Sequence, residues 1–369
     1  EIAFELYELL IAPIKSLITN HQSLITNLKI IPAGILNTIP FEALLTEKVA
    51  TNTKYADLPY LLLQYDISYH YSATLWHQAL QNIDEKQMEA RSILEEASFV
   101  GFAPVYKNEQ KQSLDEAITS GLYNEENTRS IRIGAETYSE LIHSEEEVNS
   151  VQSYFNAQNI PTETYLHTEA NTSNFLQNIG KHKYVLISAH GFYNEEQPDL
   201  TGIILSPRIA KNPEQSGQAS PTPEFPLWRG QGEVNGDVRS GQMSPNHKGV
   251  GESSLNSEPS SIFYLSDAYN LQLNADLVVL SCCETGLGKL AIGEGVMALN
   301  RGFFYAGAKN VIYTLFKVYD KASCQLTQHL FQHILEQKRY PSALKEAKRQ
   351  LILEGKAPIH WAGYLLIGE

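Results

Sequence analysis

Residues 275–290 read Ala-Asp-Leu-Val-Val-Leu-Ser-Cys-Cys-Glu-Thr-Gly-Leu-Gly-Lys-Leu, and this stretch decides the fold class. Residues 277–280 form a short apolar run, rich in β-branched side chains and without polar alternation. Such a run is typical of a strand that is buried on both faces of a parallel sheet. Ligands of open α/β sheets bind beyond the carboxyl ends of the strands. A cysteine at the end of this run, such as Cys283, therefore stands where chemistry is usually done.

A second strand ends in the same way. Residues 184–188 are mostly apolar and run into Ala189-His190-Gly191. A thiol needs a base or a cationic neighbour to become a nucleophile near neutral pH. A lone buried cysteine is usually an inert small hydrophobe, and a lone histidine at a strand end is usually a hydrogen-bonded structural group. Together, at equivalent ends of two strands, His190 and Cys283 favour a catalytic pair.

Strand and helix patterns alternate along most of the chain. The spacing predicts strands over 99–102 and 310–315, and a helix capped by Asn171. This alternation indicates a parallel sheet with crossover helices. We also expect a strand over 60–68 and a helix over 293–306.

Three consecutive glutamates open another expected helix. Ser144 precedes Glu145, Glu146 and Glu147, which is the pattern of a capping residue followed by acids in the first turn. Apolar side chains at helical spacing after residue 147 give this helix its buried stripe. We expect the three glutamates to be surface groups that complement the helix dipole, and we do not read them as a metal site.

The bulk composition narrows the class of protein. The chain has 369 residues, 43% hydrophobic content and a formal net charge of -14. The negative charge argues against nucleic acid or an anionic membrane as a direct partner. No apolar run is long enough to span a bilayer. Three cysteines, two of them adjacent, form no disulfide framework, which favours the cytoplasm.

Several motifs resemble the CHAT family of caspase-like cysteine peptidases, which are related to separase and the caspases. The family usually has Ser-Ala-Cys-Glu-Thr-Gly where residues 281–286 read Ser-Cys-Cys-Glu-Thr-Gly, so Cys282 replaces the alanine. Two positions depart from the pattern: Phe316 is usually Trp, and Tyr319 is usually Asn or Asp. The remaining matching segments are His190-Gly191, Gly293-Glu294-Gly295, Ala306-Gly307-Ala308, residues 315–320, residues 360–364, Ile31-Pro32-Ala33-Gly34 and residues 39–44.

The resemblance implies an α/β fold with a caspase-like, mostly parallel sheet flanked by helices. It implies a smaller N-terminal pseudo-protease α/β subdomain over 1–97 and a protease domain over 98–369. Residues 208–261 are rich in Ser, Gly, Pro, Asn and Gln and cannot offset their ordering entropy. We expect a flexible insertion there. A tolerated surface insertion is the simpler interpretation, and a regulatory or self-cleaved linker is the alternative.

The implied activity is that of a cysteine endopeptidase. Cys283 attacks the scissile carbonyl and His190 manages the protons, while the backbone N–H groups of Gly191 and Cys283 form the oxyanion hole. By resemblance to separase, Asp320 lines the pocket for a basic residue before the scissile bond. Asp199 and Asp267 are lesser candidates for substrate binding. An equal alternative is that Asp320 only caps the helix that follows it.

Two other functions use the same residues. A non-catalytic caspase-like interaction or scaffold module is the main alternative, and a thiol-dependent acyltransferase or ligase is a third. We expect Cys282 to be a buried substitute for the alanine, because successive strand side chains point to opposite faces. The scattered histidines and the lack of a Cys-x-x-Cys pair exclude a zinc site, and we expect no cofactor.

The expected partners are proteins. A protein or peptide is the expected substrate. The chain begins Glu-Ile-Ala-Phe, without an initiator methionine, and we read it as the carboxyl-terminal piece of a longer protein. A preceding region, such as the helical repeats that CHAT proteins often carry, or a separate partner is the expected regulator.

Overall fold

The computed structural model describes the chain in segments: 1–15, 26–81, 97–104, 130–133, 136–139, 141–192, 200–206, 261–282, 289–291, 295–297 and 299–368. All of them belong to one compact unit, Glu1–Arg208 with Pro259–Glu369. A second unit, Ile209–Glu258, lies outside the described residues and includes nearly all of the insertion expected over 208–261.

Helices and strands alternate through the described segments. The α-helices are α1 (Ile2–Leu10), α3 (Leu61–Gln64), α4 (Ala73–Gln81), α7 (Ser144–Ala157), α8 (Thr172–Asn178), α9 (Leu265–Ala268), α10 (Leu299–Tyr305), α11 (Asp320–Leu335) and α12 (Tyr340–Leu353). The strands are β1 (Asn27–Ile30), β2 (Asp66–Tyr69), β3 (Phe99–Ala103), β4 (Ser130–Ile133), β5 (Glu136–Ser139), β6 (Thr162–Leu166), β7 (Tyr184–Phe192), β8 (Gly202–Ile204), β9 (Ile262–Tyr264), β10 (Leu277–Cys282), β11 (Lys289–Ala291), β12 (Gly295–Met297), β13 (Val311–Thr314) and β14 (Tyr364–Ile367).

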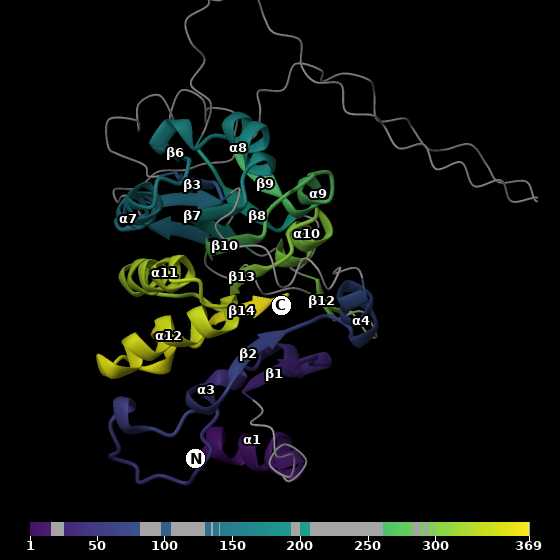
Figure 1. Ribbon diagram of the computed structural model, residues 1–369, viewed down its shortest axis with the longest axis vertical. Coiled ribbons are helices and arrows are strands. Elements are labelled where there is room, and N and C mark those ends of the chain that lie inside the picture. The colour runs from purple at the N-terminus through teal and green to yellow at the C-terminus, as the bar shows by residue number, and fades with distance from the viewer. Residues whose placement is uncertain are drawn as a thin grey trace, which may run out of the picture. The chain divides into compact units, whose positions relative to one another are not determined.

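The main sheet combines two parallel blocks. Its order is β1-β2-β14-β13-β10-β7-β3-β6, and β8 and β9 extend from β7 (Figure 1). The strands from β13 to β6 are mutually parallel, and so are β14, β2 and β1. The blocks meet where β13 pairs antiparallel with β14. The predicted α/β fold with a mostly parallel sheet flanked by helices is confirmed.

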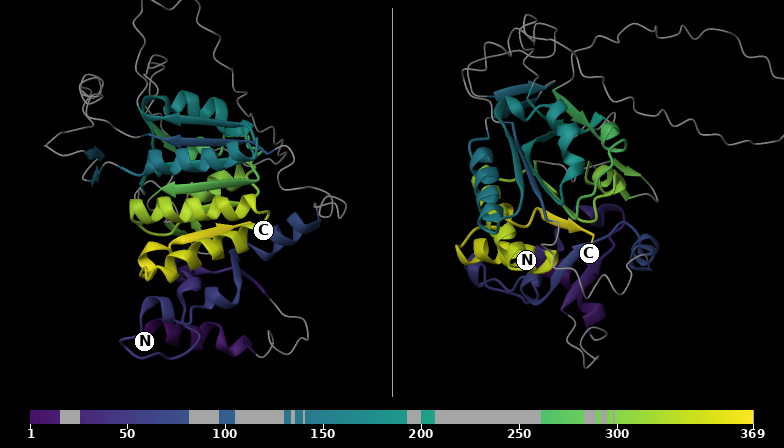
Figure 2. Two further views of the ribbon diagram at one scale, coloured as in Figure 1. Left: turned by 60° about the vertical axis from the view of Figure 1, so that its left-hand side comes forward. Right: turned by 45° about the horizontal axis from the view of Figure 1, so that its top comes forward.

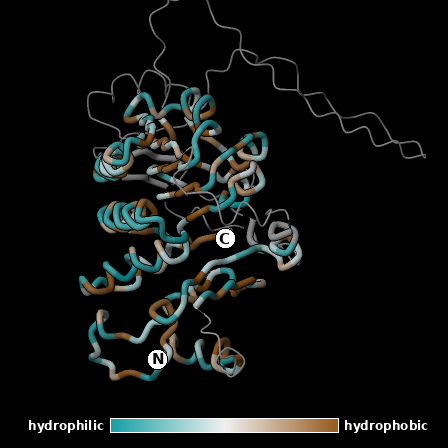
Figure 3. Tube along the Cα trace, in the orientation of Figure 1, coloured by the Kyte–Doolittle hydropathy of each residue, from teal (hydrophilic) through white to brown (hydrophobic). Residues whose placement is uncertain are grey.

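Helices cover both faces of the sheet. Helices α7, α11 and α12 lie on one face, and α8, α9 and α10 lie on the other (Figures 1 and 2). Each face has its own apolar core, so all side chains of β3, β7 and β10 are buried. Hydrophobic colouring accordingly recurs along the central strands in Figure 3. Burial on both faces explains why these strands show apolar runs without alternation.

Helix α7 packs closely on β3. Its apolar stripe of Val148, Val151 and Phe155 is fully buried. A Cβ atom at Gly101 of β3 would lie 2.5 Å from Cγ1 of Val148, so only glycine permits this separation of helix and strand. The close packing brings the first turn of α7 against the central strands.

Two predicted elements are wrong in part. Residues 61–64 form helix α3, where a strand over 60–68 was expected, and only residues 66–69 form a strand. Short apolar runs such as Leu61-Leu62-Leu63 do not distinguish strand from buried helix by periodicity. Residues 295–297 form strand β12, which pairs with β11, where the expected helix was to begin at residue 293. The cap at Asn171 is confirmed, since its side chain accepts a hydrogen bond from the backbone N–H of Asn174.

A buried ion pair joins the N-terminal segment to α12. Nζ of Lys348 lies 3.0 Å from Oε1 of Glu42, and the two side chains are 0% and 1% exposed. The hydroxyl of Tyr69 donates to the other oxygen of Glu42 at 2.6 Å. Burial lowers the pKa of Lys348, and the attraction of Glu42 partly offsets that effect. The domain boundary at residue 97 stays a prediction.

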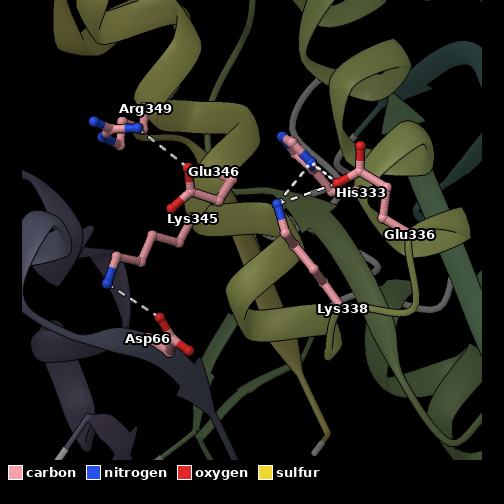
Figure 4. A network of polar contacts seen from close by, with 7 residues as sticks. All are labelled: Asp66, His333, Glu336, Lys338, Lys345, Glu346 and Arg349. Atoms are coloured by element: carbon pink, nitrogen blue, oxygen red, sulfur yellow. Dashed lines mark hydrogen bonds and ion pairs between the residues drawn. The ribbon is translucent and has the colours of Figure 1, made fainter.

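A second, more exposed set of charges lies on the helices of this layer (Figure 4). Lys345 of α12 pairs with Asp66 of β2 at 3.2 Å, with both side chains mostly buried. Arg349 pairs with Glu346 at 3.4 Å on the outer surface of the same helix, where the side chains are 47% and 29% exposed. Within the described segments, no helix combines the length and the apolar character needed to cross a bilayer.

We predict that Lys348→Met destabilises the fold by about 3–5 kcal/mol, because it leaves the Glu42 carboxylate buried without its cation. Chemical denaturation measures this loss. Arg349→Ala, one residue further along α12, is the matched control and should change the free energy of unfolding by less than about 0.5 kcal/mol. Adding Glu42→Gln should recover much of the loss. Equal effects of Lys348→Met and Arg349→Ala would contradict the buried-pair interpretation.

Candidate active site

The position of His190 follows from strand β7. This strand is buried over all nine of its residues, and His190 is 7% exposed. Tyr184 and Leu186 belong to the apolar core under α7 and α11, whereas Val185 and Ile187 belong to the opposite core. Strand alternation therefore directs Ser188 and His190 to the face that α7 and α11 cover. The strand continues past His190, whose partner in the β8 ladder is Ile204.

Strand β10 runs parallel to β7 over six consecutive pairs. The register begins with Leu277 opposite Tyr184 and ends with Cys282 opposite Ala189. The carboxyl end of β10 therefore lies beside Ala189, and His190 is the next residue of β7. Cys283 follows Cys282 in the sequence and lies outside the described residues. Asp199, a lesser candidate for substrate binding, also lies outside them.

Cys282 belongs to the opposite face of the sheet. Its side chain is 1% exposed, and its thiol donates to the carbonyl of Ile187 at 3.3 Å. The hydroxyl of Thr314 on β13 donates to the carbonyl of Cys282. The prediction that Cys282 is a buried group is confirmed. The carboxyl end of β10 is thus held from β7 on one side and from β13 on the other.

Asp320 is the first residue of α11 and lies at the same edge of the sheet. Its Oδ2 atom accepts the backbone N–H of His143 at 2.8 Å, which ties the start of α11 to the start of α7. Burial raises the pKa of Asp320, and the hydrogen bond from His143 partly offsets that effect. The expected alternative, a cap of its own helix, is not the contact observed, because no side-chain hydrogen bond caps α11.

Gly191, expected in the oxyanion hole, and Asp267, expected in the substrate pocket, lie in different parts of the fold. Gly191 follows His190 on β7 and pairs with Ile203 of β8. Asp267 lies on α9, in the helical layer on the opposite face from α11. Its carboxylate accepts the backbone N–H of Tyr264 at 2.9 Å and so caps α9. The described residues bring His190, Gly191 and Asp320 to one edge, and they leave Asp267 in the other layer.

The two departures from the CHAT sequence pattern lie near the carboxyl end of β13. Phe316 fills the space beside Gly363, where a Cβ atom would lie 2.9 Å from its ring. Tyr319 is 58% exposed, and its ring centroid lies 4.7 Å from that of His360. An exposed aromatic ring therefore stands directly before Asp320.

Sequence reasoning missed Glu147. The expectation of a surface group is wrong for this residue, which is 1% exposed. Its Oε2 atom accepts the hydroxyl of Ser188 at 2.6 Å. Residues 147, 151 and 155 lie on one helical face at a spacing of four, so the apolar stripe itself could have signalled a buried position. Ser144 is also the first helical residue and not the cap, a position that His143 takes.

The buried carboxyl of Glu147 has an unusual pKa. Burial raises its pKa to about 7, and the nearby hydroxyls of Ser188, Thr327 and Ser281 oppose that effect. Within the described residues its Oε1 atom has no partner at hydrogen-bond distance, so Thr327 and Ser281 act on the carboxyl over a longer distance than Ser188 does. The described residues contain no cluster of three or more potential metal ligands.

Comparison with known proteins places the chain in a family. The CHAT domain family model matches residues 1–369. Among curated proteins, tetratricopeptide repeat protein 28 of Homo sapiens is 35% identical over 107 residues, and that of Mus musculus is 33% identical over the same length. These alignments cover 28% of this chain and only 4% of the relatives.

Solved structures of similar fold include two proteins at 9% identity. The Saccharomyces cerevisiae separase–securin complex has a TM-score of 0.47, covering 94% of this chain and 16% of that chain. The Arg-specific cysteine proteinase gingipain R has a TM-score of 0.48, covering 97% of this chain and 66% of that chain. The family model matches the whole sequence, and this chain therefore belongs to the CHAT domain family.

Proposed function

We propose that this CHAT domain is a cysteine endopeptidase with a His190–Cys283 dyad. The observation that carries the proposal is the β7–β10 ladder, which ends with Cys282 opposite Ala189. His190 is the residue that follows Ala189 in the sequence, and Cys283 is the residue that follows Cys282. Consecutive Cα atoms are about 3.8 Å apart across a peptide bond, so Cys283 cannot lie far from the end of this ladder.

The proposed reaction needs only the dyad and backbone donors. His190 accepts the thiol proton of Cys283, and the thiolate attacks the scissile carbonyl carbon. The N–H groups of Gly191 and Cys283 bind the oxyanion that forms. The tetrahedral intermediate collapses to a thioester and expels the amine, which takes the proton from His190. Water, deprotonated by His190, then releases the acid and regenerates the thiol.

We predict that Cys283→Ala lowers kcat/KM on a peptide library by at least about a thousandfold, and His190→Ala by about a hundredfold or more. Mass-spectrometric profiling of the cleaved peptides measures both effects. Cys282→Ala is the matched control: it removes a neighbouring thiol, restores the residue usual in the family and should retain activity.

The same variants test the alternative of a non-catalytic scaffold. In an active dyad, Cys283 reacts with an electrophilic thiol probe faster than free cysteine does, and His190→Ala removes that advantage. Labelling of Cys283 at the rate of free cysteine, together with the absence of any cleaved peptide, would establish the scaffold function.

We further propose that Asp320 selects a basic residue before the scissile bond. The support is its location at the carboxyl edge of the sheet, six residues beyond Thr314 of β13. A carboxylate there offers charge-assisted hydrogen bonds to Arg or Lys. Asp199 remains a lesser proposed contributor. The structural bond from His143 to Asp320 must be preserved in any test of this proposal.

Asp320→Asn meets that requirement, because the amide oxygen still accepts the N–H of His143 while the charge is lost. We predict that the preference for Arg over Leu falls by roughly 10- to 100-fold, since hydrogen bonds to charged groups contribute about 1.5–3 kcal/mol. Asp267→Asn removes the same charge from the opposite layer and should leave the preference unchanged. An unaltered Arg preference in Asp320→Asn would restrict Asp320 to anchoring α7.

We also propose that a protein partner or a repeat region regulates this domain. The support is the similarity to tetratricopeptide repeat protein 28. The aligned part covers only 4% of the length of that protein. Tetratricopeptide repeats form extended concave surfaces that bind other proteins. A partner held in this way is suited to controlling access of a peptide to the dyad.

A further inference from the structure

A buried polar cluster lies against strands β7 and β10, and the proposed peptidase mechanism does not use it. It consists of Glu147 and the hydroxyl side chains of Ser188, Ser281 and Thr327. We call it the Glu147 cluster. Every member is at most 7% exposed. Burying a carboxyl group costs free energy unless it is hydrogen-bonded, and burying its charge costs more unless the charge is paired.

The two serines relate the cluster to the dyad. Ser188 of β7 and Ser281 of β10 are direct partners in the parallel ladder. In the sequence, each stands two residues before a member of the proposed dyad, His190 and Cys283 respectively. Two residues correspond to roughly 7 Å along strand β7 from Ser188 to His190. Glu147 reaches them from α7 and accepts the hydroxyl of Ser188 at 2.6 Å. One carboxyl group thus lies against both strands below the site.

A third strand is connected to the same cluster. The hydroxyls of Ser281 and Tyr364 lie 3.3 Å apart, which links β10 to β14. Thr327 faces the carboxyl from α11 and is fully buried. The members of the Glu147 cluster therefore come from helices α7 and α11 and from strands β7 and β10, and Tyr364 connects the cluster to β14.

Several charges around Glu147 add to the effect of burial on its protonation. Asp320 of α11 raises the pKa of Glu147, and the buried thiol of Cys324 on α11 has its own pKa raised first by burial and then by Glu147. Glu145 and Glu146 share the first turn of α7 and oppose a further negative charge. The positive end of the α7 dipole favours the carboxylate. None of the largest influences on the pKa of Glu147 is a lysine or an arginine.

The facing strands add further titratable groups without a compensating cation. The hydroxyl of Tyr364 on β14 lies 3.3 Å from that of Ser281, and His190 of β7 lies two residues beyond Ser188. Strand β3 presents Gly101 and apolar side chains to α7. Burial therefore dominates and raises the pKa of Glu147 to about 7. Oε2 of Glu147 accepts the hydroxyl of Ser188, and the neutral acid places no charge on Oε1, which has no hydrogen-bond partner among the described residues.

We propose that Glu147 is a positioning residue of the active site, which in its neutral form packs against Ser188 of β7 and Ser281 of β10 and loses this role when it ionises. The inference rests on the proposed function, because the groups it positions are the proposed dyad. Ionisation places an uncompensated charge in the core beside Ser188 and Ser281. The site is therefore assembled below neutrality and loosens as the pH rises.

The test compares wild type with Glu147→Gln, whose amide is neutral at every pH and retains one donor group and one acceptor. With a pKa of about 7, about a tenth of wild-type molecules keep the neutral acid at pH 8. The ratio of kcat/KM, variant to wild type, should be near one at pH 6 and rise about tenfold by pH 8. Glu146→Gln is the matched control, since its side chain is 61% exposed on the same helical turn, and its ratio should stay near one.

A second variant guards against an effect on folding alone. Ser188→Ala removes the 2.6 Å hydrogen bond and should lower kcat/KM at pH 6, where Glu147→Gln does not. A ratio for Glu147→Gln that stays flat across this pH range, or that falls as the pH rises, overturns the proposal. So does full activity of Ser188→Ala at pH 6.

Alkylation of Cys283 separates this proposal from the proposed function. Iodoacetamide labelling, read by peptide mass spectrometry, requires no substrate. If His190→Ala slows labelling but the Glu147→Gln ratio is flat, the dyad stands and the role of Glu147 is overturned. If His190→Ala leaves labelling unchanged, the dyad is absent and both proposals fail.

Chemical denaturation in the Cys283→Ala background tests the titration itself. The folded pKa of Glu147, about 7, lies above its ordinary value of 4.5. Its contribution to the free energy of unfolding is therefore complete below about pH 4.5, falls as the pH rises and levels off above about pH 7. Glu147→Gln should lack this decline and Glu146→Gln should keep it. Identical pH dependence in wild type and Glu147→Gln overturns the proposal.

Discussion

The parallel pairing of β7 with β10 is the constraint on which the rest of the structure depends. Six consecutive residue pairs fix the register, from Leu277 opposite Tyr184 to Cys282 opposite Ala189. A slip of one residue would exchange the faces of every side chain. Because both faces are buried under separate apolar cores, such a slip would expose no polar face to solvent and would instead place Ser188 and Ser281 against the wrong core. The polar cluster and the strand ends are therefore specified together.

Two carboxyl groups are buried in this fold, and they have different kinds of partner. Glu42 is paired with the equally buried Lys348 and also accepts the hydroxyl of Tyr69. Glu147 has a hydroxyl partner in Ser188 but no cation among the described residues. A paired carboxylate can keep its charge in the core, whereas an unpaired one is favoured as the neutral acid. The first joins two parts of the chain, and the second responds to pH.

Patterns that arise from local physics were predictable. The apolar runs of β7 and β10 indicate strands buried on both faces, and Asn171 marks a helix start because its side chain satisfies a backbone N–H. The predictions failed where local patterns are ambiguous. Residues 61–64 carry three leucines that fit a helix or a strand, and residues 295–297 pair with another strand whose position the local sequence does not specify.

The sequence by itself determined the fold class, the family motifs and the pair of strands that carry His190 and precede Cys283. Apolar periodicity and covalent order encode these features locally. Only the tertiary structure decided that Ser188 and Ser281 lie side by side, that Glu147 reaches them from α7, and that Asp320 holds His143. These contacts join residues 41 to 177 positions apart in the chain. Their partners, and the burial that raises the pKa of Glu147, exist only once the helices have packed on the sheet.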